Sequence, residues 1–233
     1  MVALIVLAHG SRHHAAPRGV DKLTAAAGAL LGVEARTGYL DLNEPLLADV
    51  AFELAEAGHE RAIVVPLLFT RAFHAKVDAP AAVAEAAALS GMHLELTSGL
   101  GTSSDIAAIL AQRVIADAPP AAEVALYSVG TSQARPNSSV AALAEQVAEL
   151  TGRRVHTTAA TCGKSVQDVA VDCADLHVLP LFVTEGLLLD KVTKAMHQIA
   201  ADTDTRLTVS APLETALADI VAARYRTSVY VAA

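Results

Sequence analysis

The chain has 233 residues, of which 53% are hydrophobic and only 3% aromatic, and it contains no tryptophan. This composition suits one large α/β domain or two smaller ones and argues against disorder. The formal net charge of −8 argues against unspecific binding of nucleic acid, and no apolar run is long enough to span a bilayer.

In the first half of the chain, β-rich runs alternate with helical patterns rich in alanine and leucine. Gly32 and Gly58 stand where glycines commonly end helices, and Asn43 stands where an N-cap would precede a helix that starts at Pro45. The segment Ala-Pro-Pro-Ala-Ala at 118–122 indicates a linker. The expected strands are 2–7, 35–42, 61–68 and 93–97, and the expected helices are 18–31, 45–57, 80–89 and 104–117.

The same alternation returns after the linker. The sequence Leu-Pro-Leu-Phe-Val-Thr at 179–184 resembles Val-Pro-Leu-Leu-Phe-Thr at 65–70, which indicates an internal duplication. We therefore expect an N-terminal lobe at 1–118 and a C-terminal lobe at 119–233. The expected strands of the second lobe are 124–129, 155–158, 176–183 and 206–209, and its expected helices are 140–150, 165–173, 191–201 and 213–225.

The alternation predicts an α/β fold of two similar lobes, each a four-stranded parallel, doubly wound sheet flanked by helices. Ligands bind such sheets beyond the carboxyl ends of the strands, where the strand order reverses. With the order 2-1-3-4, that point lies between the first and third strands. Because His9 follows the first strand and His74 follows the third, the topology brings both imidazoles to one crevice.

Other side chains expected at this crevice suggest its chemistry. Glu44 lies at the end of the second strand, and two imidazoles with a carboxylate can hold a divalent transition metal ion or accept protons. Arg12, Arg71 and Lys76 stand near the two histidines and favour a polyanionic ligand. A hydrolase that uses Ser11 is an alternative, although the GxSxG elbow of such enzymes is missing.

The remaining histidines are expected at the surface or in structural roles, and the two cysteines as free thiols. Cys162 and Cys173 form no CxxC pair, which agrees with a reducing compartment. The apolar segment 2–8 lacks the basic start and the cleavage site of an export signal. We therefore expect a cytoplasmic protein. The histidines in question are His13, His14, His59, His93, His156, His177 and His197.

Two segments resemble the sirohydrochlorin chelatases of the CbiX/SirB type: Leu-Ala-His-Gly-Ser-Arg at 7–12 and the segment from Val65 to Pro80. The resemblance implies a class II chelatase, which needs no ATP and inserts Fe²⁺ or Co²⁺ into sirohydrochlorin during siroheme or cobalamin synthesis. It implies that His9 and His74 bind the metal and accept the pyrrole protons, and that Glu44 assists. The residues expected to bind the substrate are Ser11, Arg12, Arg71 and Lys76.

The resemblance also implies the partners and the role of the second lobe. Sirohydrochlorin and Fe²⁺ or Co²⁺ would be substrates, no cofactor would be permanently bound, and neither nucleic acid nor membrane would be a partner. Val-Gly-Thr-Ser at 129–132 has no histidine, and Leu188 stands at the counterpart of His74. The C-terminal lobe would therefore form only the other wall of an active cleft between the lobes. A monomer is expected, with a homodimer as the alternative.

Two other functions stay open on the sequence. A non-catalytic carrier of a tetrapyrrole or a metal would keep the same pocket without turnover. A binding module of the periplasmic type would also have two lobes and a cleft, but the absence of an export signal and the one-sided histidine pair argue against it.

Overall fold

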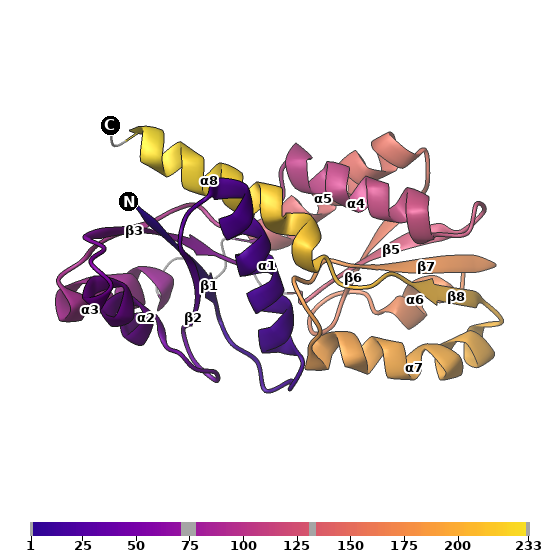
Figure 1. Cartoon of the computed structure of the whole chain (residues 1–233). Coiled ribbons are helices and arrows are strands. Elements are labelled where there is room, and N and C mark those ends of the chain that lie inside the picture. The colour runs from indigo at the N-terminus through magenta and orange to yellow at the C-terminus, as the bar shows by residue number, and fades with distance from the viewer. Residues whose placement is uncertain (1, 71–77, 131–133, 232–233) are drawn as a thin grey trace. The chain divides into compact units, whose positions relative to one another are not determined.

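The computed structural model describes residues 2–70, 78–130 and 134–231, except for the side chains of 134–137, 230 and 231 (Figure 1). It divides into two compact units. The first comprises Met1–Gly101 together with Glu214–Ala233, and the second comprises Thr102–Leu213. Each unit contains one four-stranded parallel sheet, which confirms the predicted fold class. No helix within the described residues is long and apolar enough to cross a membrane.

The sheet of the first unit has the order β2-β1-β3-β4, as the switch-point argument requires. β1 is buried along its whole length because it pairs with β2 on one side and β3 on the other. The elements of this unit are β1 (Ala3–Ala8), α1 (Ala16–Leu31), β2 (Ala35–Tyr39), α2 (Leu47–Glu56), β3 (Arg61–Pro66), α3 (Ala79–Ser90), β4 (His93–Leu96), the 3₁₀ helix η2 (Glu214–Leu217) and α8 (Ala218–Val231).

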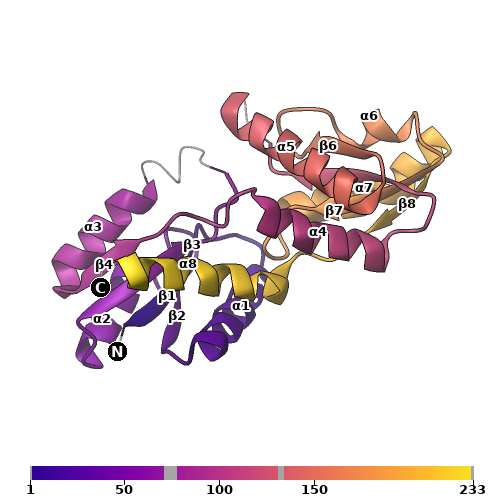
Figure 2. The ribbon, with the colours of Figure 1, turned by 90° about the horizontal axis from the view of Figure 1, so that it is seen from above.

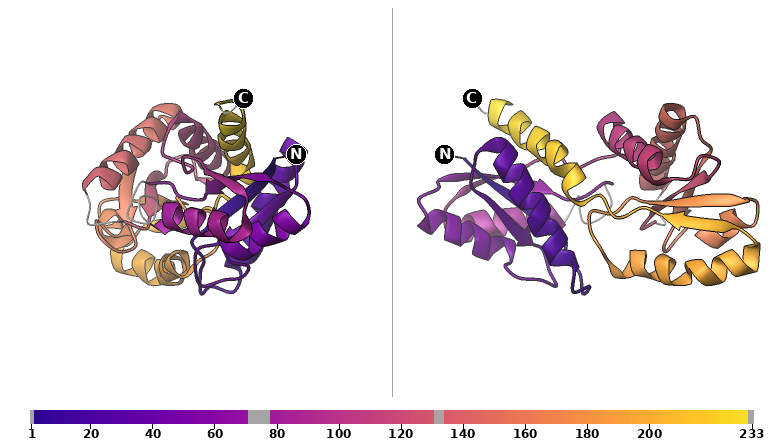
Figure 3. Two further views of the ribbon diagram at one scale, coloured as in Figure 1. Left: turned by 90° about the vertical axis from the view of Figure 1, so that its left-hand side faces the viewer. Right: turned by 45° about the vertical axis from the view of Figure 1, so that its right-hand side comes forward.

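Helices cover both faces of this sheet. Side chains of α2 and α3, among them Val50, Leu54 and Val83, pack in one apolar cluster with Ile5 and Leu7 of β1. α1 packs beside α8, and α8 also contacts β3 (Figure 3). A doubly wound sheet of this kind leaves the carboxyl ends of its strands free for a binding site.

The second unit repeats this plan with the sheet order β6-β5-β7-β8. α4 and α5 lie side by side, and α7 lies on the opposite side of the sheet from them (Figures 1 and 2). The elements are α4 (Ser104–Asp117), β5 (Glu123–Ser128), α5 (Ala134–Thr151), β6 (Val155–Ala159), α6 (Val166–Ala170), β7 (Asp175–Pro180), α7 (Leu187–Thr203) and β8 (Arg206–Val209).

Strand register supports the internal duplication. Leu7 of β1 is paired with Pro66 of β3, and Tyr127 of β5 is paired with Pro180 of β7. In both units the backbone continues in the same way, because Leu67 N donates to Leu7 O and Leu181 N donates to Tyr127 O, each at 2.8 Å. The two Pro-Leu segments therefore occupy equivalent positions, as their sequence similarity indicates.

The compact units are not the continuous segments 1–118 and 119–233. α4 belongs to the first sequence repeat but packs on α5 in the second unit, and α8 belongs to the second repeat but packs in the first. In α8, Arg224 donates to the carbonyl oxygens of Gly99 and Leu100, with N–O distances of 3.1 and 2.8 Å. The Tyr225 hydroxyl donates to Val2 O at 2.6 Å. The last helix of each repeat thus completes the other unit.

Some helix ends differ from the prediction. Asn43 is not the N-cap of the second helix, because α2 begins at Leu47, after a cis peptide bond between Glu44 and Pro45. The Leu46 N–H donates instead to the Asp49 carboxylate at 3.1 Å, so the first turn is capped from within the helix. The terminal helix begins at Ala218 and not at residue 213, because 214–217 form a 3₁₀ turn.

Candidate functional site at the carboxyl edge of the first sheet

His9 directly follows β1 and is exposed, although the six residues of the strand before it are buried. β1 lies between β2 and β3, so His9 leaves the sheet where the strand order reverses. The end of β3 is fixed beside it by the hydrogen bond from Leu67 N to Leu7 O. This is the position that the switch-point argument predicts for His9.

The loop after β2 runs alongside the loop after β1. Leu40 N donates to Ala8 O and Asp41 N donates to His9 O, each at 3.0 Å, so the sheet pairing continues past the strand ends. This pairing holds the backbone of His9. It also brings Glu44, which is exposed in the same loop as Asp41, to the carboxyl edge that bears His9.

A glycine and an asparagine fix the geometry of this junction between the two loops. Gly10 has φ +100°, and a Cβ added there would collide with the carbonyl oxygen of Asp41. The Asn43 side chain accepts a hydrogen bond from Ser11 N at 2.7 Å, while its own backbone N–H donates to Asp41 O at 2.8 Å. Asn43 therefore joins the His9 loop to the loop that carries the carboxylate. Sequence reasoning assigned Asn43 to a helix cap and missed this role.

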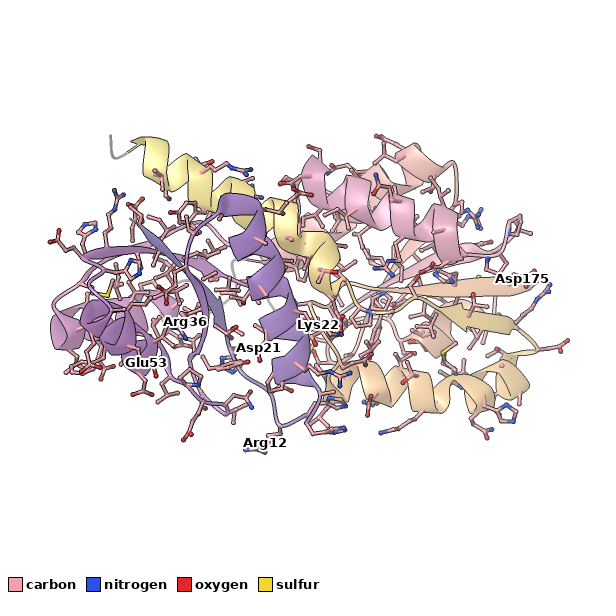
Figure 4. The ribbon with its side chains drawn as sticks, viewed as in Figure 1. Arg12, Asp21, Lys22, Arg36, Glu53 and Asp175 are labelled. Carbon is pink, nitrogen blue, oxygen red and sulfur yellow. The ribbon has the colours of Figure 1, made fainter. Side chains whose placement is uncertain are left out.

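The residues after Gly10 form a turn that leads into α1. The Ser11 hydroxyl accepts from His13 N at 3.1 Å, so Ser11 stabilises the turn. The rings of His13 and His14 are stacked, with centroids 4.9 Å apart. Arg12 is exposed in the loop that precedes α1 (Figure 4). Its charge is thus available on the His9 loop.

Tyr39, the last residue of β2, is a buried phenol next to this edge. It is paired with Ala8 and is only 3% exposed. Burial and, to a lesser degree, the negative charge of Asp21 raise the pKa of Tyr39 to about 12. The phenol therefore keeps its proton near neutral pH, and it does not compete with the exposed imidazole and carboxylate as a base.

Three predicted site residues, Arg71, His74 and Lys76, lie outside the described residues. Their pairing with His9 stays a prediction. In the sequence these residues follow β3, which pairs with β1, and precede α3.

The second unit has the same junction without the imidazole. Ala160 N donates to Ser128 O at 2.9 Å and Thr161 N donates to Val129 O at 3.1 Å, so Val129 occupies the position of His9. Gly130, at φ +80°, corresponds to Gly10, and a Cβ there would lie 2.8 Å from Cys162 O. The same backbone junction is thus present in both units, but a histidine stands at this position only in the first unit.

Solved chelatases share this fold. SirB from Bacillus subtilis, solved with Fe³⁺, matches with a TM-score of 0.83 and 20% identity over 98% of this chain and 96% of that chain. CbiX, described as the terminal enzyme for biosynthesis of siroheme in denitrifying bacteria, matches with a TM-score of 0.72 and 17% identity, covering 98% and 99% of the two chains. At these identities the likeness concerns the fold alone.

Two curated relatives match part of the chain. The sirohydrochlorin cobaltochelatase of Sulfurisphaera tokodaii is 35% identical over 77 residues, which are 33% of this chain and 62% of that protein. The sirohydrochlorin cobaltochelatase of Methanopyrus kandleri is 30% identical over 81 residues, 34% of this chain and 57% of that protein. Each match spans less than two thirds of the relative.

A match to a family model extends over almost the whole chain. The CbiX model matches residues 3–117 and again residues 123–228. Together these segments include both sheets and the carboxyl-edge junctions described above. The chain therefore belongs to the CbiX family.

Proposed function

We propose that this chain is a sirohydrochlorin chelatase that inserts Fe²⁺ or Co²⁺ into the tetrapyrrole. The observation that carries the proposal is the junction at the carboxyl edge of the first sheet. There His9 is held by its own backbone against the loop that carries Glu44, within a chain of the CbiX family. Two relatives described as sirohydrochlorin cobaltochelatases support the same substrate.

In the proposed reaction, His9 and His74 bind the incoming metal ion and accept the protons that two pyrrole nitrogens release. Imidazole is suited to both tasks, because it ligates borderline divalent ions as a neutral base and takes up protons near neutral pH. Glu44 supplies a carboxylate beside His9 and helps to remove the protons. The substrate carboxylates bind to Arg12, Arg71, Lys76 and Ser11.

The preference between Fe²⁺ and Co²⁺ does not follow from these ligands. Nitrogen and oxygen donors obey the general affinity order of divalent ions and separate these two metals poorly. We propose that both are accepted in solution, and that supply of the metal decides which product forms.

The proposal is tested by metal insertion with the purified chain. Sirohydrochlorin and Co²⁺ or Fe²⁺ are mixed without oxygen, and the absorbance change of the macrocycle is followed. His9→Ala is expected to lower kcat about 100-fold, because proton transfer by a positioned group contributes about that factor. Glu44→Gln should lower kcat less. Val129→Ala, at the matching position of the second unit, should keep the wild-type rate.

Two results would overturn this assignment. If His9→Ala inserts metal as fast as Val129→Ala, His9 has no part in the chemistry. If the wild-type chain binds sirohydrochlorin tightly but inserts neither metal, the protein is a tetrapyrrole carrier and not an enzyme.

A further inference from the structure

A second group of metal-ligating side chains lies in the unit Thr102–Leu213, at the amino edge of its sheet. Glu123 is the first residue of β5, His156 is the second residue of β6, and Cys173 follows α6. The nearby Asp175, at the start of β7, marks this edge in Figure 4. The group lies at the opposite end of the sheet from the carboxyl-edge junction at Val129, and His9 belongs to the other unit.

The three side chains converge although they come from three different elements. One ligand atom of each, a carboxylate oxygen, an imidazole nitrogen and the Cys173 sulfur, lies within 4.8 Å of the other two. His156 Nε2 and Glu123 Oε2 are 2.6 Å apart. Cys173 is buried, with 8% exposure, and the other two residues are half-buried. Partial burial shields these atoms from water and from competing counterions.

The set of donors is that of a zinc site. Thiolate, imidazole and carboxylate are the three ligand types that Zn²⁺ takes from proteins, at about 2.0–2.3 Å, and a water can complete a tetrahedron. Binding would replace the proton that Glu123 and His156 share and move their two atoms apart to about 3.3 Å, the spacing of ligands in such a tetrahedron. That is a shift of less than one ångström for two side chains at strand starts.

The surrounding groups set the cost of binding. The Cys173 thiol donates to Val169 O, with a sulfur–oxygen distance of 3.3 Å. Burial, and then the negative charge of Glu123, raise the pKa of Cys173 to about 11, so the metal-free protein holds a thiol that the ion must deprotonate. Arg154 lies 3.7 Å from Glu123, but its side chain is 73% exposed and can turn into solvent.

The first unit offers an internal comparison at its own amino edge. There His59 Nε2 lies 2.9 Å from Glu34, so a histidine–carboxylate pair is present as well. The other partner of that carboxylate is Arg36, at 2.8 Å, and not a thiol. The cysteine therefore distinguishes the second pair from the first.

We propose that Glu123, His156 and Cys173 form a binding site for a divalent transition metal ion of the Zn²⁺ type. The site uses none of the residues assigned to metal insertion and does not depend on that function. Because the three ligands come together only in the folded unit, the bound ion stabilises that unit, and the stabilisation rises with the logarithm of the ion's concentration over its dissociation constant.

Co²⁺ absorbance tests the site, since a thiolate ligand gives Co²⁺ a charge-transfer band in the near ultraviolet. The full wild-type chain, titrated without oxygen, is expected to show this band and to saturate at one thiolate-bound Co²⁺ per chain, and Zn²⁺ should abolish the band. Cys173→Ser should lack it. Cys162→Ser, which removes the other, exposed cysteine, should retain it. No band in the wild type, or a band that persists in Cys173→Ser, overturns the proposal.

A second pair of variants separates loss of the site from loss of the fold. His156→Gln leaves Cys173 in place and should weaken Co²⁺ binding at least about tenfold. His59→Gln, in the pair without a thiol, should leave the titration unchanged. Zn²⁺ should raise the melting temperature of the wild type and of His59→Gln, but much less that of His156→Gln. Equal Co²⁺ affinity in both histidine variants would contradict the assignment of His156 as a ligand.

Discussion

Gly10 allows the two loops of the proposed site to meet. The residue has φ +100°, where residues with a side chain are strained, and the carbonyl of Asp41 occupies the space of a Cβ. Gly130 is also crowded in the second unit, where an added Cβ would lie 2.7 Å from Ala159 Cβ and 2.8 Å from Cys162 O. Since the junction recurs without a histidine, the glycine is needed for the backbone geometry and not for the chemistry alone.

We expect Gly10→Ala to lower both stability and metal insertion. Gly32 is the matched control, because it also has a positive φ of +66°, but an added Cβ meets nothing within 4 Å. Gly32→Ala should cost only about 1–2 kcal/mol for the left-handed conformation. Gly10→Ala should cost about 1–3 kcal/mol more, for the collision with Asp41. Urea unfolding measures the loss of stability in both variants. Equal losses would mean that the junction rearranges to accept a Cβ at Gly10 without further cost.

At the scale of single residues, the sequence located His9 well and Asn43 poorly. A polar residue directly after an apolar strand must lie at the sheet edge, so the place of His9 followed from the strand alone. Asn43 precedes a proline and an apolar helix, a pattern typical of an N-cap. The hydrogen bond from Ser11 N to its side chain joins residues 32 positions apart, and a local pattern holds no information on such a contact.

Among the elements, β7, β8 and α4 are joined by a chain of hydrogen bonds that runs from the buried His177 to the exposed Asp117. His177 of β7 lies between Thr208 and Ser210, with both nitrogen–oxygen distances at 2.8 Å, and is fully buried. Ser210 donates on to Asp117, the last residue of α4, at 2.7 Å. The chain of bonds ties α4 to the sheet of the second unit, and it confirms the structural role that the sequence indicated for His177.

His177 should make the stability of the protein pH-dependent. Burial lowers the pKa of His177, partly offset by Asp117, so the folded protein binds this proton less readily than the unfolded chain does. Stability is therefore fully present above the unfolded pKa of about 6.5 and falls as the pH drops below it. The slope is at most about 1.4 kcal/mol per pH unit.

Urea unfolding at pH 7.5, 6.5 and 5.5 measures this slope. His177→Gln should be less stable at pH 7.5 but should lose less stability on acidification than the wild type. His197→Gln, a change at an exposed histidine of α7, should leave the slope as it is. If His177→Gln has the same dependence of stability on pH as the wild type, the acid sensitivity comes from another group.

The strands could be predicted more fully than the helices. The eight strands of the described residues follow from apolar β-rich runs, and the order 2-1-3-4 that we assumed for a four-unit repeat is the order of both sheets. Helix ends depend on weaker and more local forces. α6 stops at Ala170 although its apolar pattern runs to residue 173. The residues after it form turns, in which Asp172 N donates to Val169 O and Cys173 N donates to Ala170 O.

For the whole molecule, the sequence repeats and the compact units have different boundaries. The repeats follow each other in the chain, but α4 completes the second unit and α8 completes the first. A repeat predicted from sequence shows the order of the elements along the chain. Which sheet a terminal helix packs on is decided by side-chain packing instead. The sheet on which each terminal helix packs could not be predicted from the sequence, because the apolar patterns of residues 104–117 and 213–225 fit any sheet with an uncovered apolar face.

α4 and α8 should each be destabilised by a mutation in the unit in which they pack, and not by a mutation in the other unit. Leu54→Ala in α2 and Leu189→Ala in α7 are matched cavities, since both leucines are at most 2% exposed and lie in clusters that contain no residue of α8 or α4. Each should cost about 2–5 kcal/mol. In hydrogen exchange followed by mass spectrometry, Leu54→Ala should speed exchange in peptides of α8 more than in those of α4. Leu189→Ala should do the reverse. If instead α4 responds to Leu54→Ala as α8 does, the chain unfolds as one body and the units have no separate stability.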